Sequence, residues 1–228
     1  MKRKVILFAV GVLVLVGCQP DKDHVRMNWP PAGTPLQVEV PANFPAMPIP
    51  ANNPFTEEGV ALGRYLFYEE RLSGDNTMSC ASCHSPEVAF TDDGNQFSTG
   101  IAGIQGTRNS MALINLAWDT RYFWDGRVFT LEDQILQPVR DPVEMHSTWP
   151  QAMDKLQAHV TYPALFQAAF GTSTIDSLLV AKAIAQFLRT MISGNSPFDR
   201  FQRGEGLLSF EASSGLGLWD REGGFPPA

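Results

Sequence analysis

The amino-acid sequence predicts a mostly α-helical fold with long loops. Apolar side chains recur at helical spacing in several segments, and capping residues precede the clearest of them. No series of alternating polar and apolar residues predicts a β-sheet. Two stretches, 90–108 and 119–127, lack any helical period, and the first is rich in glycine. Such loops need something to wrap around, and a large flat cofactor would serve as their core.

The size and charge of the chain restrict its class. Its 228 residues, 44% of them hydrophobic, suffice for one or two modest folded domains. Without residues 1–17 the chain has 14 basic and 24 acidic residues, which give a net charge of −10. An acidic surface argues against nucleic acid as a partner, because phosphates require clustered Lys and Arg. The same charge would attract a basic redox protein by long-range steering.

The first 17 residues have the pattern of a signal peptide. Lys2, Arg3 and Lys4 precede an apolar run over 5–16. This run is shorter than the roughly 17–25 residues that a membrane-spanning helix needs. We therefore expect residues 1–17 to direct export and then to be removed.

The residues at the expected cleavage site resemble the lipobox of bacterial lipoproteins. They read Leu15-Val16-Gly17-Cys18, and the resemblance implies that Cys18 becomes the lipidated first residue. Gln19 stands where an aspartate would retain a lipoprotein at the inner membrane. This favours an anchor in the outer membrane, facing the periplasm, and no other membrane contact is expected. The alternative is an ordinary signal peptide followed by an unrelated cysteine.

The next segment, residues 18–55, is predicted to form a tether and an extended arm on the domain surface. It is rich in proline and has no helical apolar spacing. Helices are expected after it. Thr56 can cap a helix whose first turn carries Glu57 and Glu58. The apolar face of this helix comprises Leu62, Tyr65 and Leu66.

Two later helices are predicted in the same way. Thr130 followed by Asp133 fits a capping box. Thr174 can cap the clearest helix of the chain, which we expect to end at Gly194. The apolar stripe of that helix comprises Val180, Ile184, Phe187, Leu188 and Met191.

The chemistry is indicated by one short motif, Cys80-Ala81-Ser82-Cys83-His84, which has the C-x-x-C-H spacing of c-type haem attachment. Two thiols three residues apart on a helical turn reach the two vinyl groups of one haem edge. Cys80 and Cys83 would thus hold haem c covalently, and His84 would be an axial ligand of its iron. A thioredoxin-like redox pair would need a βαβ setting, and a zinc site would need further ligands. The sequence supports neither alternative.

Other short motifs flank this one in a fixed order. They are Leu62-Gly63-Arg64-Tyr65-Leu66-Phe67, Arg71-Leu72-Ser73-Gly74-Asp75, Phe90-Thr91-Asp92, Arg108-Asn109-Ser110, Phe123-Trp124-Asp125-Gly126-Arg127 and Asp141-Pro142-Val143-Glu144-Met145. With the cysteine motif they resemble the amino-terminal, peroxidatic half of the bacterial di-haem cytochrome c peroxidase family. The resemblance predicts a c-type cytochrome domain over 56–205. It implies a cytochrome-c peroxidase that reduces hydrogen peroxide with electrons from a small cytochrome c or cupredoxin.

The resemblance also implies roles for individual residues. Trp124 matches a tryptophan that relays electrons between the two haems of the family. Gln134 and Glu144 match a pair above the haem that handles peroxide. Asn109 matches a position that contributes to a calcium site between the two domains.

Elementary chemistry supports the role of Glu144. Breaking the O–O bond requires a proton to move from one peroxide oxygen to the other, and a carboxylate can act as base and then as acid. The amide of Gln134 can hold peroxide or water by hydrogen bonds, but it cannot be the base. The ordinary alternatives are a solvated surface carboxylate for Glu144, and core packing among aromatic neighbours such as Trp118 for Trp124.

The sequence departs from the family pattern in the loop before Arg108. Some members hold a histidine there, which occupies the peroxidatic iron at rest, whereas this chain has no histidine between His84 and His146. The departure implies that the peroxidatic site is open without activation. His146 is a candidate sixth ligand, but we interpret it as a surface or supporting residue. His159 is interpreted as a residue on the surface of a helix.

A second C-x-x-C-H motif does not occur in the sequence, although part of its lead-in does. Residues 215–219 echo 63–67 as G-x-x-L-aromatic. The first copy reaches its cysteine 17 residues after Gly63, whereas the sequence ends 13 residues after Gly215. We therefore expect 206–228 to be the start of a truncated second cytochrome domain. Such a chain is expected to bind haem and to turn over poorly, because peroxide reduction needs two electrons.

The sequence leaves three functions open. Peroxide reduction is the leading hypothesis. The second is a mono-haem electron-transfer module or an inactive fragment, which a methionine or histidine as sixth ligand would favour, since a filled site cannot bind peroxide. The third keeps the enzyme but replaces peroxide reduction by oxidation of a protein substrate, as in relatives within the same superfamily.

Overall fold

The structure is a computed structural model that describes residues 33–92 and 94–221, and within these ranges it is helical without β-strands. Single bridges such as Pro35 to Thr56 are isolated. The prediction of a mostly α-helical fold is confirmed. The α-helices are α1 (Glu57–Phe67), α2 (Leu131–Ile135), α3 (Trp149–Gln157), α4 (Tyr162–Phe170), α5 (Ser177–Arg189), α6 (Pro197–Gln202) and α7 (Phe210–Arg221). Three short 3-10 helices are η1 (Glu70–Leu72), η2 (Cys80–Ser82) and η3 (Pro86–Val88).

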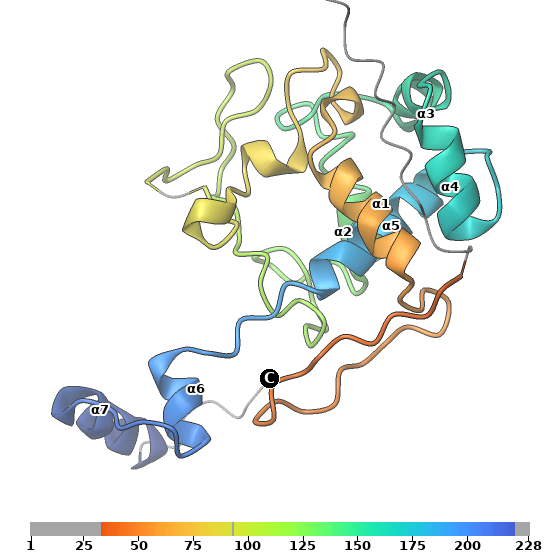
Figure 1. The fold of residues 1–228 in the computed structure, drawn as a ribbon. Helices are drawn as coiled ribbons and strands as arrows, with labels where there is room; N and C mark the ends of the chain where they lie inside the picture. Colours follow the sequence, from red (N-terminus) through yellow and green to blue (C-terminus); the bar gives the residue numbers. More distant parts are fainter. Residues whose placement is uncertain (1–32, 93, 222–228) are drawn as a thin grey trace, which may run out of the picture.

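The core is built on the crossing of α1 and α5, which lie side by side in Figure 1. The two helices approach closely because α1 has a glycine at the contact. A Cβ added to Gly63 would lie 1.9 Å from the backbone oxygen of Ala183. Helices α2 and α4 pack against this pair from other directions. The innermost apolar side chains are Leu62, Leu66, Phe67, Leu156, Phe166, Val180 and Ile184.

The predicted helix starts are confirmed in two cases of three. The Thr56 hydroxyl accepts from the backbone N–H of Gly59 (3.0 Å), and the Thr130 hydroxyl accepts from that of Asp133 (3.1 Å). The Asp133 carboxylate accepts in turn from the Thr130 hydroxyl (2.6 Å), so the side chains contact each other directly.

The predicted limits of the longest helix, α5, are wrong. Its cap is Asp176, whose carboxylate accepts from the N–H of Leu179 (2.8 Å), and not Thr174. The helix ends at Arg189 rather than at Gly194. Gly194 instead lies against the amino-terminal arm, where an added Cβ would lie 2.4 Å from Pro41. Gly194 is thus needed for contact with the arm and does not cap the helix.

The described part of the arm, residues 33–55, is extended and forms a long excursion that returns to α1 (Figure 1). The Asn43 side chain donates hydrogen bonds to Asp199 and Gln202 of α6 (both 3.2 Å). The end of the arm is buried at Asn53 and Phe55, so it is part of the core and does not lie only on the surface. The predicted signal peptide and Cys18 lie outside the described residues.

The last described helix, α7, forms where residues 215–219 echo 63–67, and it is set apart with α6 from the other helices (Figure 1). Its apolar side chains are largely exposed, with Phe210 at 83%. A Cβ added to Gly215 would meet no atom within 4 Å, in contrast to Gly63. No helix within the described ranges is long and apolar enough to cross a membrane.

Candidate active site

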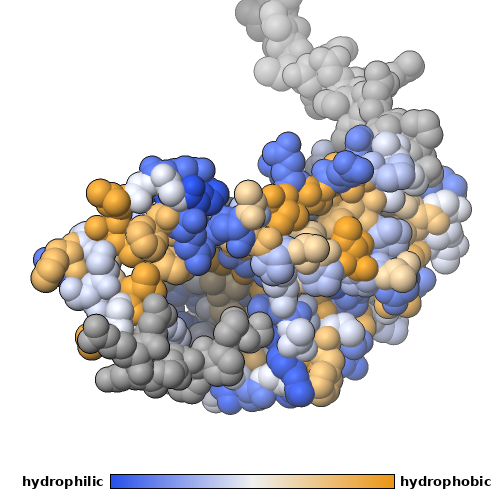
Figure 2. Space-filling model, turned by 90° about the horizontal axis from the view of Figure 1, so that it is seen from below, coloured by the Kyte–Doolittle hydropathy of each residue, from blue (hydrophilic) through white to orange (hydrophobic). Residues whose placement is uncertain are grey.

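A cavity of about 470 Å³ lies among the cysteine turn, the glycine-rich loop, α2 and α5, and its size is typical of cofactor pockets. Figure 2 shows one face of the molecule hollowed near its centre, with hydrophilic and hydrophobic residues around the hollow. The seven residues to which the sequence assigns a role in binding or catalysis line the cavity: Cys80, Cys83, His84, Asn109, Trp124, Gln134 and Glu144. Apolar side chains complete the wall, among them Phe67, Leu72, Leu113, Ile135, Val139, Ile184 and Leu188.

The turn that carries the cysteines folds locally. The backbone N–H groups of Cys83 and His84 both donate to the carbonyl of Cys80 (3.3 and 3.1 Å), which winds the chain into one short turn. The Ser82 hydroxyl accepts from the N–H of Ser79 (3.0 Å) at the start of that turn. Both thiols and the imidazole consequently line the same cavity.

The ring of His84 is oriented by a backbone carbonyl. Its Nδ1 lies 2.8 Å from the oxygen of Phe90, and because a carbonyl can only accept, Nδ1 carries the proton. Nε2 is then the nitrogen with a free lone pair, as an iron ligand requires. Burial lowers the pKa of His84, although contacts with the backbones of Phe90 and Met111 oppose this, and the ring is therefore neutral at neutral pH.

The carbonyl of Phe90 is brought to the histidine by an unusual turn. Ala89 and Phe90 both have positive φ angles (58° and 57°), which residues with a Cβ rarely adopt. Hydrogen bonds from the Phe90 N–H to the Ser85 oxygen (2.8 Å) and from the Ser85 N–H to the Thr91 oxygen (2.9 Å) hold the turn. Neither Ala89 nor Phe90 is a glycine or an asparagine, so the sequence does not indicate the two positive φ angles of this turn.

The two thiols are free, and burial raises the pKa of Cys80 to about 12 and that of Cys83 to about 11. Both groups are therefore protonated at neutral pH. A thioredoxin-like pair needs a thiol of lowered pKa, so this environment disfavours that alternative. Two thiols, a neutral imidazole and an apolar wall fit a covalently attached haem.

Gln134 and Glu144 enter the cavity from α2 and from the loop after it. The Glu144 loop is fixed by backbone contacts with distant segments. Its Met145 oxygen accepts from the N–H of Gly74 (2.8 Å), and the Glu144 oxygen accepts from that of Ile101 (3.0 Å). An added Cβ at Gly100 would lie 1.7 Å from the Val143 oxygen, so only glycine permits this approach.

The surroundings of Glu144 shift the pKa of its carboxyl group. Its side chain is exposed and lines the cavity, where neighbouring protein atoms displace part of the water around the carboxyl group. This partial loss of hydration raises the pKa of Glu144, and the negative charge of Asp141 raises it further. The positive charge of Arg127 acts in the opposite direction. The carboxyl is thus shifted toward the proton affinity that a general base near neutral pH needs.

Helix α2, which carries Gln134, is anchored by a polar network beneath it. Arg189 of α5 donates two hydrogen bonds to the Glu132 carboxylate (2.7 and 2.9 Å). The Asn53 amide donates to the same carboxylate (2.7 Å) and accepts from Gln186 (2.9 Å). The network joins the arm, α2 and α5, and it was not foreseen because its members are far apart in sequence.

Trp124 lies at the edge of the cavity and is 59% exposed, so it is not core packing. Its indole N–H donates to the backbone oxygen of Asn109 (3.0 Å). Trp118, by contrast, packs edge-to-face against the Phe44 ring, with the ring centroids 5.0 Å apart. The side chain of Asn109 is exposed, and the described residues contain no cluster of three or more His, Cys, Asp or Glu that could hold a metal ion.

Charged residues surround the tryptophan. Asp125 pairs with Arg108 (3.2 Å) and Arg127 (3.0 Å), and the Arg127 guanidinium lies 3.5 Å from the centroid of the Phe123 ring. These arginines line the cavity as well. His146 is exposed and does not line the cavity. Three methionines to which the sequence assigned no role do line it: Met78, Met111 and Met145.

Comparison with known proteins gives consistent matches. Residues 57–206 match the family model described as di-haem cytochrome c peroxidase. The methylamine utilization protein MauG of Methylorubrum extorquens is 38% identical over 181 residues, which cover 78% of this chain and 51% of that protein. The cytochrome c peroxidase Ccp of Escherichia coli is 35% identical over 179 residues, 78% of this chain and 38% of that protein.

Solved structures agree with these matches. A MauG-like protein associated with microbial copper homeostasis has a TM-score of 0.74 and 34% identity, over 81% of this chain and 55% of that one. The diheme peroxidase BthA from Burkholderia thailandensis has a TM-score of 0.66 and 26% identity, over 72% of this chain and 46% of that one. The chain spans about half the length of the MauG relatives that it matches.

Proposed function

Because the chain belongs to the di-haem cytochrome c peroxidase family, we propose that it binds one haem c and reduces hydrogen peroxide at that haem. The electron donor in this proposal is a small cytochrome c or cupredoxin. One observation carries the proposal: two protonated thiols, a neutral imidazole and a carboxylate–amide pair line the same cavity.

The residues that would hold the haem are Cys80 and Cys83, by thioether bonds, and His84, through Nε2. When bound, the haem supplies the redox chemistry that breaks the peroxide bond. The Phe90 carbonyl keeps the imidazole in the tautomer that binds iron, and its hydrogen bond makes the ring a stronger ligand.

Glu144 moves the proton in this mechanism. Its carboxylate takes the proton from one peroxide oxygen and returns it to the other, which leaves as water. Its raised pKa makes it a better base than an ordinary glutamate. The Gln134 amide, with donors and an acceptor in one plane, orients the peroxide by hydrogen bonds.

Trp124 is the proposed route for electrons between the haem and a second redox centre. Its position at the cavity edge and its exposure support this, since an electron relay must reach both the haem and a partner. The acidic composition supports a basic donor protein. A calcium ion that involves Asn109 remains part of the proposal.

The proposed location is the periplasm, with a lipid on Cys18 that anchors the protein to the outer membrane. The pattern of residues 1–18 supports this. The mass of the amino-terminal peptide from membrane-extracted protein tests it, with Cys18→Ser as the comparison. Recovery of an unmodified peptide from the native protein would contradict lipidation.

The peroxidase proposal is tested by spectroscopy of haem-loaded protein. We expect one haem per chain by pyridine haemochrome, high-spin ferric iron, and a rapid optical change on addition of peroxide. Glu144→Gln should slow that change by about 100-fold, since general acid–base catalysis contributes about 10²–10⁴-fold. Glu87→Gln is the matched control, because Glu87 is exposed and does not line the cavity.

A second candidate function is electron transfer without catalysis. The three methionines of the cavity wall favour it, since a thioether can fill the sixth position of the iron. Low-spin ferric iron that does not react with peroxide would support this function. That result would also remove the roles proposed for Glu144 and Gln134.

A further inference from the structure

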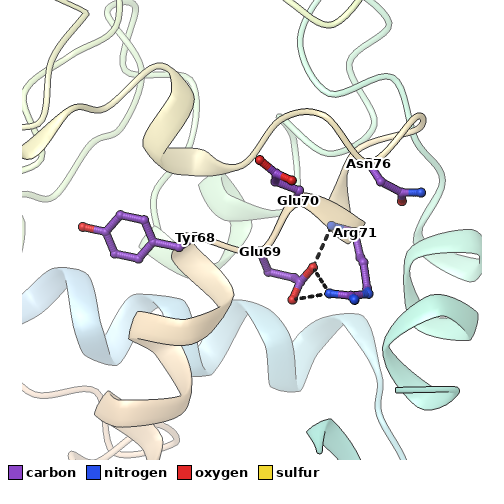
Figure 3. Close-up of a pocket in the computed structure, with 5 residues that line it drawn as sticks. All are labelled: Tyr68, Glu69, Glu70, Arg71 and Asn76. Carbon is purple, nitrogen blue, oxygen red and sulfur yellow. Dashed lines mark hydrogen bonds and ion pairs between the residues drawn. The ribbon is translucent and has the colours of Figure 1, made fainter. Parts of the chain in front are cut away.

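A second polar site includes Glu69, which lies in sequence between two residues of the cavity wall, Phe67 and Leu72. The phenol of Tyr162 on α4 donates a 2.5 Å hydrogen bond to the carboxylate of Glu69, at the start of η1. Tyr162 is only 5% exposed, and Glu69 is buried as well. The Arg71 guanidinium donates to both oxygens of the same carboxylate (2.9 and 3.2 Å), as Figure 3 shows.

The proton within this site is held on the phenol. Burial alone would raise the pKa of Glu69, but hydrogen bonds from Tyr162 and Arg71 outweigh it and keep the pKa below its ordinary value. Burial and the negative charge of Glu69 raise the pKa of Tyr162 far above the physiological range. At neutral pH the pair is thus a neutral phenol that donates to an ionised carboxylate.

The site is adjacent to the cavity through residues 67–72. Phe67 and Leu72 line the cavity, and Glu69 lies between them in sequence. The Tyr68 ring packs edge-to-face on the Phe67 ring, and the two ring centroids are 5.1 Å apart. Tyr68 and Glu69 line a second pocket, so Tyr68 connects this pocket to the cavity wall at Phe67. Leu72 and Tyr162 belong to one core cluster. The centroid of the His159 ring lies 5.1 Å from that of the Tyr162 ring.

We propose that Tyr162 and Glu69 form a redox-active pair in which the tyrosine supplies the second electron of peroxide reduction. This inference rests on the proposed function. Peroxide accepts two electrons, and the haem iron held by Cys80, Cys83 and His84 would supply the first of them. In the step, the Tyr162 O–H bond breaks, its proton passes to Glu69, and its electron passes to the haem site, where peroxide is the oxidant. The products are a neutral tyrosyl radical and a protonated carboxyl group.

The direct hydrogen bond between Tyr162 and Glu69 meets the main requirement of this step, a base in contact with the phenol. A phenol that loses an electron must lose its proton as well, and inside an apolar core only a base already in contact can accept it. The carboxylate of Glu69 meets this condition. Arg71 is partly exposed, so solvent can compensate the positive charge that remains when Glu69 is neutralised.

A matched comparison is available within the chain. Tyr122 is buried to a similar degree, at 8% exposure, but its hydroxyl donates to the backbone oxygens of Leu116 and Asp119 (3.3 and 3.1 Å). A carbonyl oxygen cannot take up a proton at neutral pH. Tyr122 should therefore resist the oxidation proposed for Tyr162.

The test is rapid-freeze EPR of haem-loaded protein mixed with hydrogen peroxide, with and without ring-deuterated tyrosine. We expect a radical whose hyperfine splitting collapses on deuteration. Tyr162→Phe should abolish it, Glu69→Gln should slow its formation by about 100-fold, and Tyr122→Phe should leave it unchanged. A radical that survives in Tyr162→Phe, or that forms at the native rate in Glu69→Gln, overturns the proposal.

The same samples separate this inference from the proposed function. If the haem spectrum responds to peroxide and no tyrosyl radical forms, the peroxidase proposal stands and the tyrosine proposal fails. If the haem does not respond, the peroxidase proposal fails. Photo-oxidation with ruthenium tris-bipyridine and persulfate then decides the tyrosine proposal, since it generates an oxidant without peroxide chemistry. A tyrosyl radical that depends on Tyr162 and Glu69 supports the pair, and its absence overturns it.

Discussion

Replacing Gly63 by alanine should force apart the two helices on which the core is built. The added Cβ would lie 1.9 Å from the Ala183 oxygen of α5, whereas ordinary contacts begin at 3.4 Å, so the backbones must separate locally by about 1.5 Å. A flexible side chain cannot relieve this contact, because the obstacle is a main-chain carbonyl in the middle of a helix.

The expected magnitude follows from two opposing effects. Overpacking a core costs roughly 1–3 kcal/mol, and the rigid obstacle places this site near about 3 kcal/mol. Alanine is a better helix former than glycine by about 1 kcal/mol, which offsets part of the cost. The free energy of unfolding should fall by about 2 kcal/mol, and the melting temperature by about 4–8 °C for a chain of this size.

The assay is thermal unfolding of haem-loaded protein followed by circular dichroism. Gly215→Ala is the matched control, since Gly215 occupies the corresponding place in α7 and an added Cβ there meets no atom within 4 Å. The control should be neutral or slightly stabilising. A Gly63→Ala protein as stable as the native one would show that α1 and α5 do not pack as closely as the structure has them.

Three further predictions concern carboxyl groups. Glu132→Gln leaves the buried Arg189 without its ionic partner. The free energy of unfolding, measured by urea titration, should fall by about 3 kcal/mol, and a fall of less than about 1 kcal/mol would refute this. Asp141→Asn keeps an oxygen for the hydrogen bond from Val143 but removes the charge that raises the pKa of Glu144. The pH at which the rate of reaction with peroxide falls on acidification should therefore be lower in this variant. An unchanged pH dependence would contradict the assignment of Glu144 as the base. Because folding raises the pKa of Glu144, the folded protein loses stability as the pH rises through that pKa and the carboxyl group ionises. Glu144→Gln removes this ionisation, so it should increase the melting temperature at pH 7 and not at pH 4.

The helices were largely predictable because the signals that start them are local. Thr56 and Thr130 act as caps through contacts within three residues, which the sequence displays directly. The start of α5 was misplaced because Thr174 and Asp176 are both able to cap, and the sequence does not say which of them meets the first turn. The buried position of Ile175, whose N–H donates to Gln157 (3.0 Å), extends the chain past Thr174 before the helix begins.

The residues of the site likewise fall into two groups: those that a local sequence pattern predicts, and those that lie far from it along the chain. The turn from Cys80 to His84 could be derived from spacing alone, since one short turn of backbone brings all three side chains together. Gln134 and Glu144 could be named only through the resemblance to a family, because they lie 50 and 60 residues further along the chain. The carbonyl that orients His84 could not be found, since a backbone oxygen has no signature in a sequence.

The strained backbone positions give an independent argument for the location of the site. Among the described residues, those with a Cβ and a positive φ include two asparagines, Asn76 and Asn115, which tolerate this conformation. Ala89, Phe90 and Phe123 do not share that tolerance, and all three belong to segments that form the cavity or orient its histidine. Such strain persists only where the surrounding contacts enforce it. The presence of this strain in these segments, together with the raised pKa of Glu144, supports the assignment of the chemistry to this cavity.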